Sequence, residues 1–87
     1  MSSVLPPIAL PAVLLQVQAQ AVAGALTESL AARVAQGDEA VLDASALSQF
    51  DSSALAVILA CRRAVLAKGA SLRITGLPER AQALAKV

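Results

Sequence analysis

Apolar runs of strand length alternate with alanine-rich runs of helix length along this chain of 87 residues. The run at 40–42 is short and apolar, which indicates a buried central strand. Residues 71–75 alternate with the period of two of a half-buried strand. The stretches 17–36, 55–66 and 79–86 have the composition of helices. This order of elements predicts an α/β fold in which helices pack against a mostly parallel sheet.

The most N-terminal strand is interrupted by proline. Residues 4–14 are apolar but contain Pro6, Pro7 and Pro11. Because proline cannot donate a ladder hydrogen bond, it is confined to edge strands and strand ends. We therefore expect one strand within this segment, at the edge of a sheet of about four strands.

Glycines are expected to end the first two helices. The first predicted helix has a stripe of apolar residues spaced four apart, namely Val22, Leu26, Leu30 and Val34. Gly37 follows this helix as a C-cap residue would, and Gly69 closes the second helix. Gly76 is expected to turn the chain after the strand at 71–75.

The chain is expected to form a single domain over residues 1–87. Hydrophobic residues make up 57% of it, but Phe50 is the only aromatic one, so leucine, valine, isoleucine and alanine must fill the core. The last predicted helix has barely two turns before Val87, which is consistent with a domain truncated at its C-terminal end.

Few residues of the chain could carry chemistry. There is no histidine, and Cys61 stands alone within an apolar run, where a small buried hydrophobic side chain is expected. The carboxylates are scattered and the four glycines are isolated, so the sequence contains neither a metal-binding pattern nor a phosphate-binding loop. We therefore expect no enzymatic activity, no metal and no cofactor.

Charge and hydropathy exclude two further classes of function. A net charge of +1 and a single aromatic residue argue against nucleic-acid binding. The first 27 residues carry no charge, but they lack the basic start of a signal peptide, and prolines and glutamines interrupt the apolar stretch that a membrane span needs. We expect a cytoplasmic protein without a membrane-spanning helix.

One polar cluster stands among apolar neighbours. Asp51, Ser52 and Ser53, here called the 51–53 turn, precede the second predicted helix and are residue types that cap helix N-termini. A hydroxyl group displayed there could also bind a partner or accept a phosphate. Capping and docking are compatible, so both interpretations stay open.

The second predicted helix carries more apolar surface than one sheet face needs. One charge-free stripe consists of Ala54, Val57, Ile58, Cys61, Ala64 and Val65. A second stripe, Leu55, Leu59 and Leu66, is interrupted by Arg62. This surplus indicates either an exposed face for a partner protein or burial against a neighbouring helix.

Three segments of the chain resemble the STAS domain family: 40–43 (AVLD), 50–55 (FDSSAL) and 72–77 (LRITGL). This family includes the anti-sigma factor antagonists and the small MlaB-like STAS subunit of Mla-type lipid-transport ABC systems. The resemblance extends over roughly residues 8–87, and the ending at 76–86 is similar to the last helix of MlaB-like proteins. It implies the non-catalytic α/β fold of the antagonists, with four helices and roughly four strands.

The resemblance also implies a role for Ser52. In the antagonists, the anti-sigma factor, which is itself a kinase, phosphorylates the hydroxyl group at this position. In MlaB-like subunits, the equivalent hydroxyl group contacts the ATPase of the transporter. Two positions depart from the family pattern: Ala54 replaces a glycine, and Leu15 replaces the aspartate that antagonists tend to carry near the phosphorylated serine. The leucine favours the MlaB-like group.

The resemblance therefore predicts a non-enzymatic accessory subunit that docks on the cytoplasmic ATPase of an ABC-type phospholipid transporter. Such a transporter maintains outer-membrane lipid asymmetry, and the subunit would be peripheral to the inner membrane through its partner. The predicted partner-binding residues are Asp51, Ser52, Ser53, Leu55, Leu59 and Arg62. The alternative is an anti-sigma factor antagonist that its kinase regulates by phosphorylating Ser52.

Overall fold

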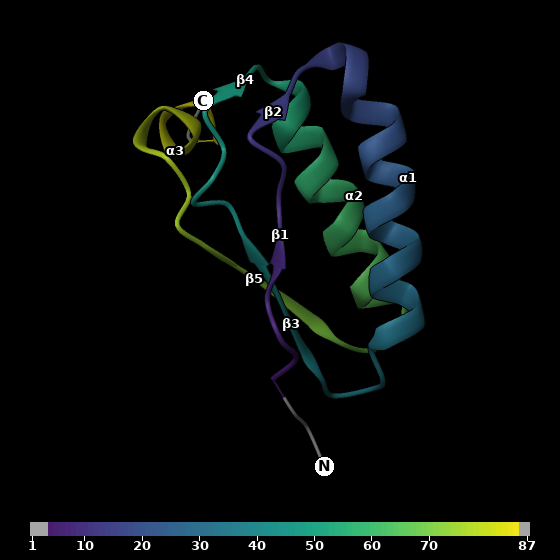
Figure 1. The fold of residues 1–87 in the computed structure, drawn as a ribbon. Coiled ribbons are helices and arrows are strands. Elements are labelled where there is room, and N and C mark those ends of the chain that lie inside the picture. Colours follow the sequence, from purple (N-terminus) through teal and green to yellow (C-terminus); the bar gives the residue numbers. More distant parts are fainter. Residues whose placement is uncertain (1–3, 86–87) are drawn as a thin grey trace.

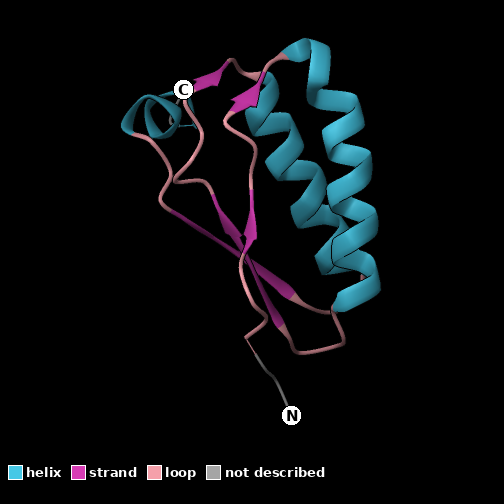
Figure 2. Cartoon of the chain, in the orientation of Figure 1, coloured by secondary structure: helices cyan, strands magenta, loops and turns pink. Residues whose placement is uncertain are grey.

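The computed structural model describes residues 4–85 and has the predicted α/β architecture (Figures 1 and 2). In chain order its elements are β1 (Ile8–Ala9), β2 (Val13–Leu14), α1 (Gln16–Arg33), β3 (Glu39–Asp43), β4 (Gln49–Phe50), α2 (Ser53–Ala67), β5 (Ser71–Thr75) and α3 (Glu79–Ala85). Within these residues there are five strands, one more than the four or so expected, and three helices where the resemblance implied four.

The strands form two small parallel sheets. The larger has the order β1-β3-β5, and the smaller pairs β2 with β4. The single strand expected within residues 4–14 is thus two strands, because the chain bends at Pro11 and Ala12 after leaving β1. The edge position of β1 agrees with the prolines beside it.

β3 is the central strand, as its apolar sequence predicts. Ala40, Val41 and Leu42 are all buried. On the neighbouring strand β5, Leu72 and Ile74 pack against the core, whereas the residues between and beside them are exposed. β5 therefore has the alternation and the bounds that its sequence indicates.

α1 and α2 lie side by side and cover one face of the three-stranded sheet (Figure 1). The prediction that α1 extends to residue 36 is wrong, because the helix ends at Arg33. The Asp38 carboxylate accepts a hydrogen bond from the Ala35 N–H (2.9 Å), and the Asp38 N–H donates to the Ala35 carbonyl (3.0 Å). These bonds form a tight turn, so Gly37, with φ +87°, belongs to the turn and is not the helix cap.

The other two glycine predictions are confirmed. Gly69 has φ +76° and follows Lys68, the C-cap of α2. Gly76 has φ +67° and turns the chain between β5 and α3. α3 begins at Glu79 as predicted, and the last residue of the predicted helix, Lys86, lies outside the described residues.

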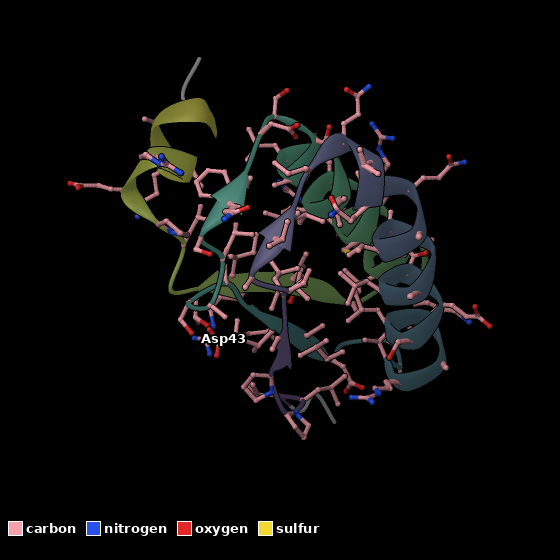
Figure 3. The ribbon with its side chains drawn as sticks, turned by 45° about the horizontal axis from the view of Figure 1, so that its top comes forward. Asp43 is labelled. Carbon is pink, nitrogen blue, oxygen red and sulfur yellow. The ribbon has the colours of Figure 1, made fainter. Side chains whose placement is uncertain are left out.

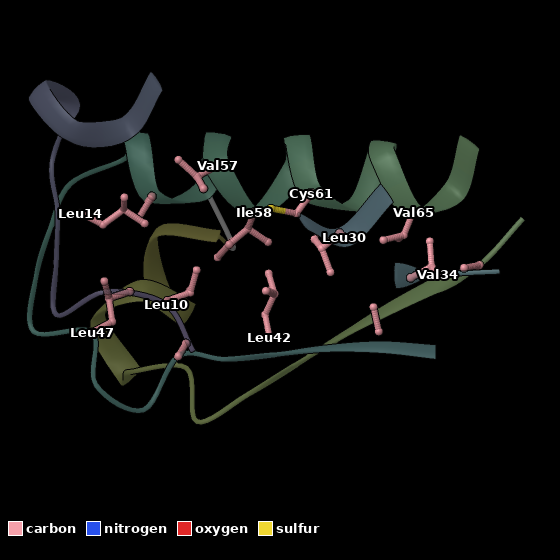
Figure 4. Close-up of a cluster of buried hydrophobic side chains, with 14 residues drawn as sticks. Leu10, Leu14, Leu30, Val34, Leu42, Leu47, Val57, Ile58, Cys61 and Val65 are labelled. Carbon is pink, nitrogen blue, oxygen red and sulfur yellow. The ribbon is translucent and has the colours of Figure 1, made fainter. Parts of the chain in front are cut away.

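The core lies between the two long helices and the sheet (Figure 4). Its least exposed large side chains are Leu10, Leu14, Leu30, Leu42, Val57, Val65 and Cys61. The stripe of α1 contributes to it as predicted, since Leu30 and Val34 are buried and Val22 and Leu26 pack beside them. Cys61 is fully buried among them, which confirms it as a buried hydrophobic side chain, and this burial raises the pKa of its thiol to about 11.

Candidate functional site

The 51–53 turn joins β4 to α2 at the carboxyl ends of the parallel strands. α2 begins at Ser53, and Ser52 occupies the N-cap position with helical backbone angles (φ −62°, ψ −17°). The Ser52 side chain makes no capping hydrogen bond. The sequence therefore located the start of the helix correctly, but the cap comes from another residue of the turn.

Asp51 is that capping residue, and it caps two helices. Its Oδ1 accepts a hydrogen bond from the N–H of Ser53, the first residue of α2, at 2.8 Å. Its Oδ2 accepts one from the N–H of Gln16, the first residue of α1, at 3.2 Å. One carboxylate thus satisfies a free N–H at the start of each long helix.

Electrostatics agree with this role of Asp51. The hydrogen bond from the Ser53 N–H is the main cause that holds the pKa of the Asp51 carboxyl below its ordinary value. Desolvation opposes this effect in part, and the hydrogen bond from the Gln16 N–H adds to it. The helix N-termini favour the same ionised form. Since both carboxylate oxygens have partners within the chain, Asp51 shapes the turn, and its predicted contact with a partner protein stays a prediction.

Ser52 is left as the exposed hydroxyl group of the turn. It is solvent-exposed, and its side chain has no hydrogen-bond partner within residues 4–85. Ser53 is only partly buried, and its N–H is engaged by Asp51. A partner that approached the turn would therefore meet the Ser52 hydroxyl group first.

The second apolar stripe of α2 is on the surface. Leu59 is 49% exposed, Leu66 is 53% exposed, and Leu55 is partly buried. Arg62 is exposed within the same stripe. The first stripe faces the core, with Ala54, Val57, Ile58, Cys61 and Val65 all buried. Of the two readings of the surplus apolar residues, the structure supports the exposed face.

A hollow of about 220 Å³ adjoins this stripe. It is lined by Leu55, Ile58 and Leu59 of α2, by Ile74 of β5, and by Leu77 in the turn that leads to α3. All five lining residues are aliphatic. The predicted site residues Leu55 and Leu59 therefore line one wall of an open apolar depression.

Leu15, the departure from the antagonist pattern, lies beside the 51–53 turn. It is the N-cap residue of α1, and the next residue, Gln16, donates the hydrogen bond to Asp51. The Leu15 N–H itself donates to Oε1 of Gln18 at 3.1 Å. The position at which antagonists tend to carry an aspartate therefore directly precedes the residue that is bonded to Asp51, and it holds an apolar side chain.

Two contacts near the site were not predicted. The Arg80 guanidinium of α3 lies over the Phe50 ring, 5.0 Å from its centroid, and its Nη2 lies 3.4 Å from the Ser48 carbonyl oxygen. These contacts attach α3 to β4 beside the turn. The sequence gives no local signal for the contact with Phe50, because Arg80 follows it 30 positions later.

Asp43, at the carboxyl end of β3, also closes a turn (Figure 3). Its Oδ1 accepts a hydrogen bond from the Ser45 N–H at 2.9 Å. The Ser45 hydroxyl group, followed by the Ser45 N–H, lowers the pKa of the Asp43 carboxyl. This carboxylate therefore stabilises the loop between β3 and β4.

Two other kinds of feature are not found among the described residues. No group of three or more cysteine, aspartate or glutamate side chains within residues 4–85 could hold a metal ion. None of the helices in that range is both long and apolar enough to cross a bilayer.

Residues 12–87 match the family model described as Mlab, STAS domain. No curated protein and no solved structure gives a match. The match includes the 51–53 turn, all of α2 and the whole lining of the hollow.

Proposed function

Because the chain belongs to the STAS domain family, in the group named for MlaB-like proteins, we propose that it is a subunit docking on the ATPase of an ABC-type phospholipid transporter. STAS domains are small accessory or regulatory domains and are generally non-enzymatic. In this proposal the chain is cytoplasmic, and its partner holds it at the inner membrane. The transporter maintains the lipid asymmetry of the outer membrane.

The observation that carries this proposal is the surface of α2 next to the 51–53 turn. The Ser52 hydroxyl group has no partner within the described residues, and Leu59 and Leu66 are each about half exposed on the same helix. Leu59 also lines the apolar hollow together with Leu55, and apolar surface that continues into a hollow favours a protein contact. Leu55, Leu59 and Ser52 therefore form the proposed docking face.

The alternative function uses the same serine as a phosphorylation site. Leu15 argues against it, because an apolar side chain stands where the antagonists tend to carry a carboxylate. Asp51 does not replace that carboxylate, since both of its oxygens accept hydrogen bonds from helix N-termini. A docking surface therefore agrees better with this turn than a phosphorylation switch.

Two substitutions test the docking face against the purified ATPase. We expect Ser52→Glu and Leu59→Asp each to weaken binding by about tenfold or more. Ser52→Glu replaces the proposed hydroxyl contact by a larger charged group, and Leu59→Asp places a charge in an apolar contact. Both residues are exposed, and a carboxylate at Ser52 lies favourably at a helix N-terminus, so neither change should unfold the chain. Binding is measured by calorimetry, and folding by circular dichroism.

Ala25→Asp provides the matched control. Ala25 is exposed on α1, so the substitution adds the same charge away from the docking face. We expect this variant to bind the ATPase as the wild type does. If Ser52→Glu and Leu59→Asp also bind unchanged, the docking face is wrong. Stoichiometric phosphate on Ser52 after incubation with an anti-sigma kinase and ATP would instead support the antagonist.

A further inference from the structure

One line of residues along α2, beginning at its N-cap, has the spacing of a helix–helix contact. Ser52, Leu55, Leu59, Arg62 and Leu66, here called the α2 seam, are separated by three, four, three and four positions. A repeat of 3.5 residues keeps side chains on one line of a helix, where a second helix can pack along it. At 1.5 Å per residue the seam is about 21 Å long, or about four helical turns.

The hollow adjoins the N-terminal half of this seam. Leu55 and Leu59 belong to both, and the opposite wall comes from Ile74 and Leu77. An apolar cavity of about 150 Å³ holds a benzene molecule. The hollow, at about 220 Å³, therefore has room for one large aliphatic or aromatic side chain of a partner.

Charge indicates what else the partner must offer. α2 carries Arg62 and Arg63 but no aspartate or glutamate. Within residues 4–85, no carboxylate pairs with Arg62. A helix packed along the seam would remove Arg62 from water, and burying an arginine without a counter-charge is costly. The covering surface must therefore supply a carboxylate.

The same argument disfavours a second copy of the chain. Its α2 would bring another Arg62 and no acidic residue to the contact. Acidic residues do occur elsewhere, but the exposed Glu28 and Glu79 lie on α1 and α3 and not along the seam. Asp51 is occupied by two N–H groups, and Glu39 is paired with Arg73 at 3.0 Å. A different protein is thus the better source of the carboxylate.

We propose that an amphipathic helix of the ATPase, about four turns long, packs along the α2 seam. One of its large apolar side chains fills the hollow, and a carboxylate one to two turns further along pairs with Arg62. This inference rests on the proposed function, since it specifies the chemistry of the partner at the same docking face.

Arg62 and Arg63 provide a matched pair for the test. Successive residues of a helix are about 100° apart, so Arg63 points away from the seam that contains Arg62. We expect Arg62→Glu to weaken binding to the purified ATPase by about tenfold or more, because the new carboxylate would repel the carboxylate of the partner helix. Arg63→Glu makes the same change in charge and should stay within about threefold of the wild type.

A charge swap then identifies the partner group. Hydrogen exchange first identifies the segments of the ATPase that become protected in the complex. The acidic residues in these segments are then replaced by lysine one at a time. One of these variants should restore binding of Arg62→Glu while weakening that of the wild-type chain. Equal losses for Arg62→Glu and Arg63→Glu, or the absence of any restoring variant, would overturn the inference.

Failure of this inference can be told apart from failure of the proposed function. If Leu59→Asp abolishes binding but Arg62→Glu does not, the docking face stands and the acidic helix is wrong. If neither variant changes binding, both are wrong. If the free chain sediments as a dimer, the seam belongs to a contact with a second copy, and the inference is overturned. If the chain binds phosphatidylglycerol vesicles and Arg62→Glu abolishes that binding, the seam faces a membrane, and the inference is likewise overturned.

Discussion

At the residue scale, one side chain organises the candidate site. The Asp51 carboxylate bonds to the first N–H of α1 and to the first N–H of α2, which are 37 positions apart in the sequence. Ser52, held between these two helix starts, is the residue that remains exposed. Asp51 is therefore a positioning residue for the hydroxyl group that the proposed contact uses.

Replacing Asp51 should change how stability depends on pH. Its folded-state pKa lies below the ordinary value of 3.8, so its stabilisation is complete above that value and is lost as pH falls through the lower folded-state pKa. Asp51→Asn keeps an acceptor but cannot titrate. We expect the wild type to lose more free energy of unfolding between pH 7 and about pH 3 than this variant loses.

Urea denaturation at the two pH values measures this difference. The remaining acid sensitivity of Asp51→Asn should come in part from Asp43, whose pKa is also lowered. Ser52→Ala provides the control, because the Ser52 side chain makes no capping hydrogen bond. If Asp51→Asn and the wild type lose the same free energy of unfolding between the two pH values, the charge of Asp51 does not stabilise the N-termini of the two helices.

At the element scale, the sequence predicts the longer segments well. β5 and the first residue of α3 agree with the prediction, because the alternation of β5 and the presence of Pro78 directly before α3 are local signals. The end of α1 is three residues earlier than predicted, because the bonds between Ala35 and Asp38 compete with the helix. β4 was not predicted, since two residues form no pattern and only their pairing with β2 defines them.

The turn between β5 and α3 permits a sharp test. A Cβ atom at Gly76 would lie 2.8 Å from the Ser45 Cβ, and Gly76 has φ +67°. We expect Gly76→Ala to reduce the free energy of unfolding by at least about 1–2 kcal/mol, from the left-handed backbone alone. The collision with the loop after β3 should add to this loss.

Gly24→Ala is the matched control for this substitution. Gly24 lies inside α1, where an added Cβ meets nothing within 4 Å. Alanine there should raise the free energy of unfolding by about 0.5–1 kcal/mol, because it restricts the unfolded chain. Urea denaturation of both variants measures these two changes in the free energy of unfolding, which should have opposite signs. A Gly76→Ala variant as stable as the wild type would refute the close approach of Gly76 to Ser45.

At the scale of the whole molecule, periodicity in the sequence predicts the α/β class, the central position of β3 and the two stripes of α2. These features depend on burial, which a period of two or 3.6 residues reveals. The arrangement of the candidate site, in contrast, could not be predicted from the sequence. The double cap of Asp51, the hollow and the contact of Arg80 with Phe50 all join residues that are distant in the sequence.

The candidate site thus brings together features from the whole fold. The seam comes from α2 and its N-cap Ser52. On the opposite wall of the hollow, Ile74 comes from β5 and Leu77 from the turn that follows it. Leu15, at the start of α1, contributes the apolar surroundings that distinguish this turn from the antagonist pattern. The central claim is that this surface docks on an ABC-type ATPase.

The most direct test is to recover the tagged chain from its native cells and identify the proteins bound to it by mass spectrometry. Leu59→Asp serves as the control, since it should leave the fold intact and remove the docking face. We predict that the wild-type chain retains the ATPase of a phospholipid transporter and that Leu59→Asp does not. Recovery of an anti-sigma kinase, with phosphate on Ser52 and no ATPase, would contradict this account.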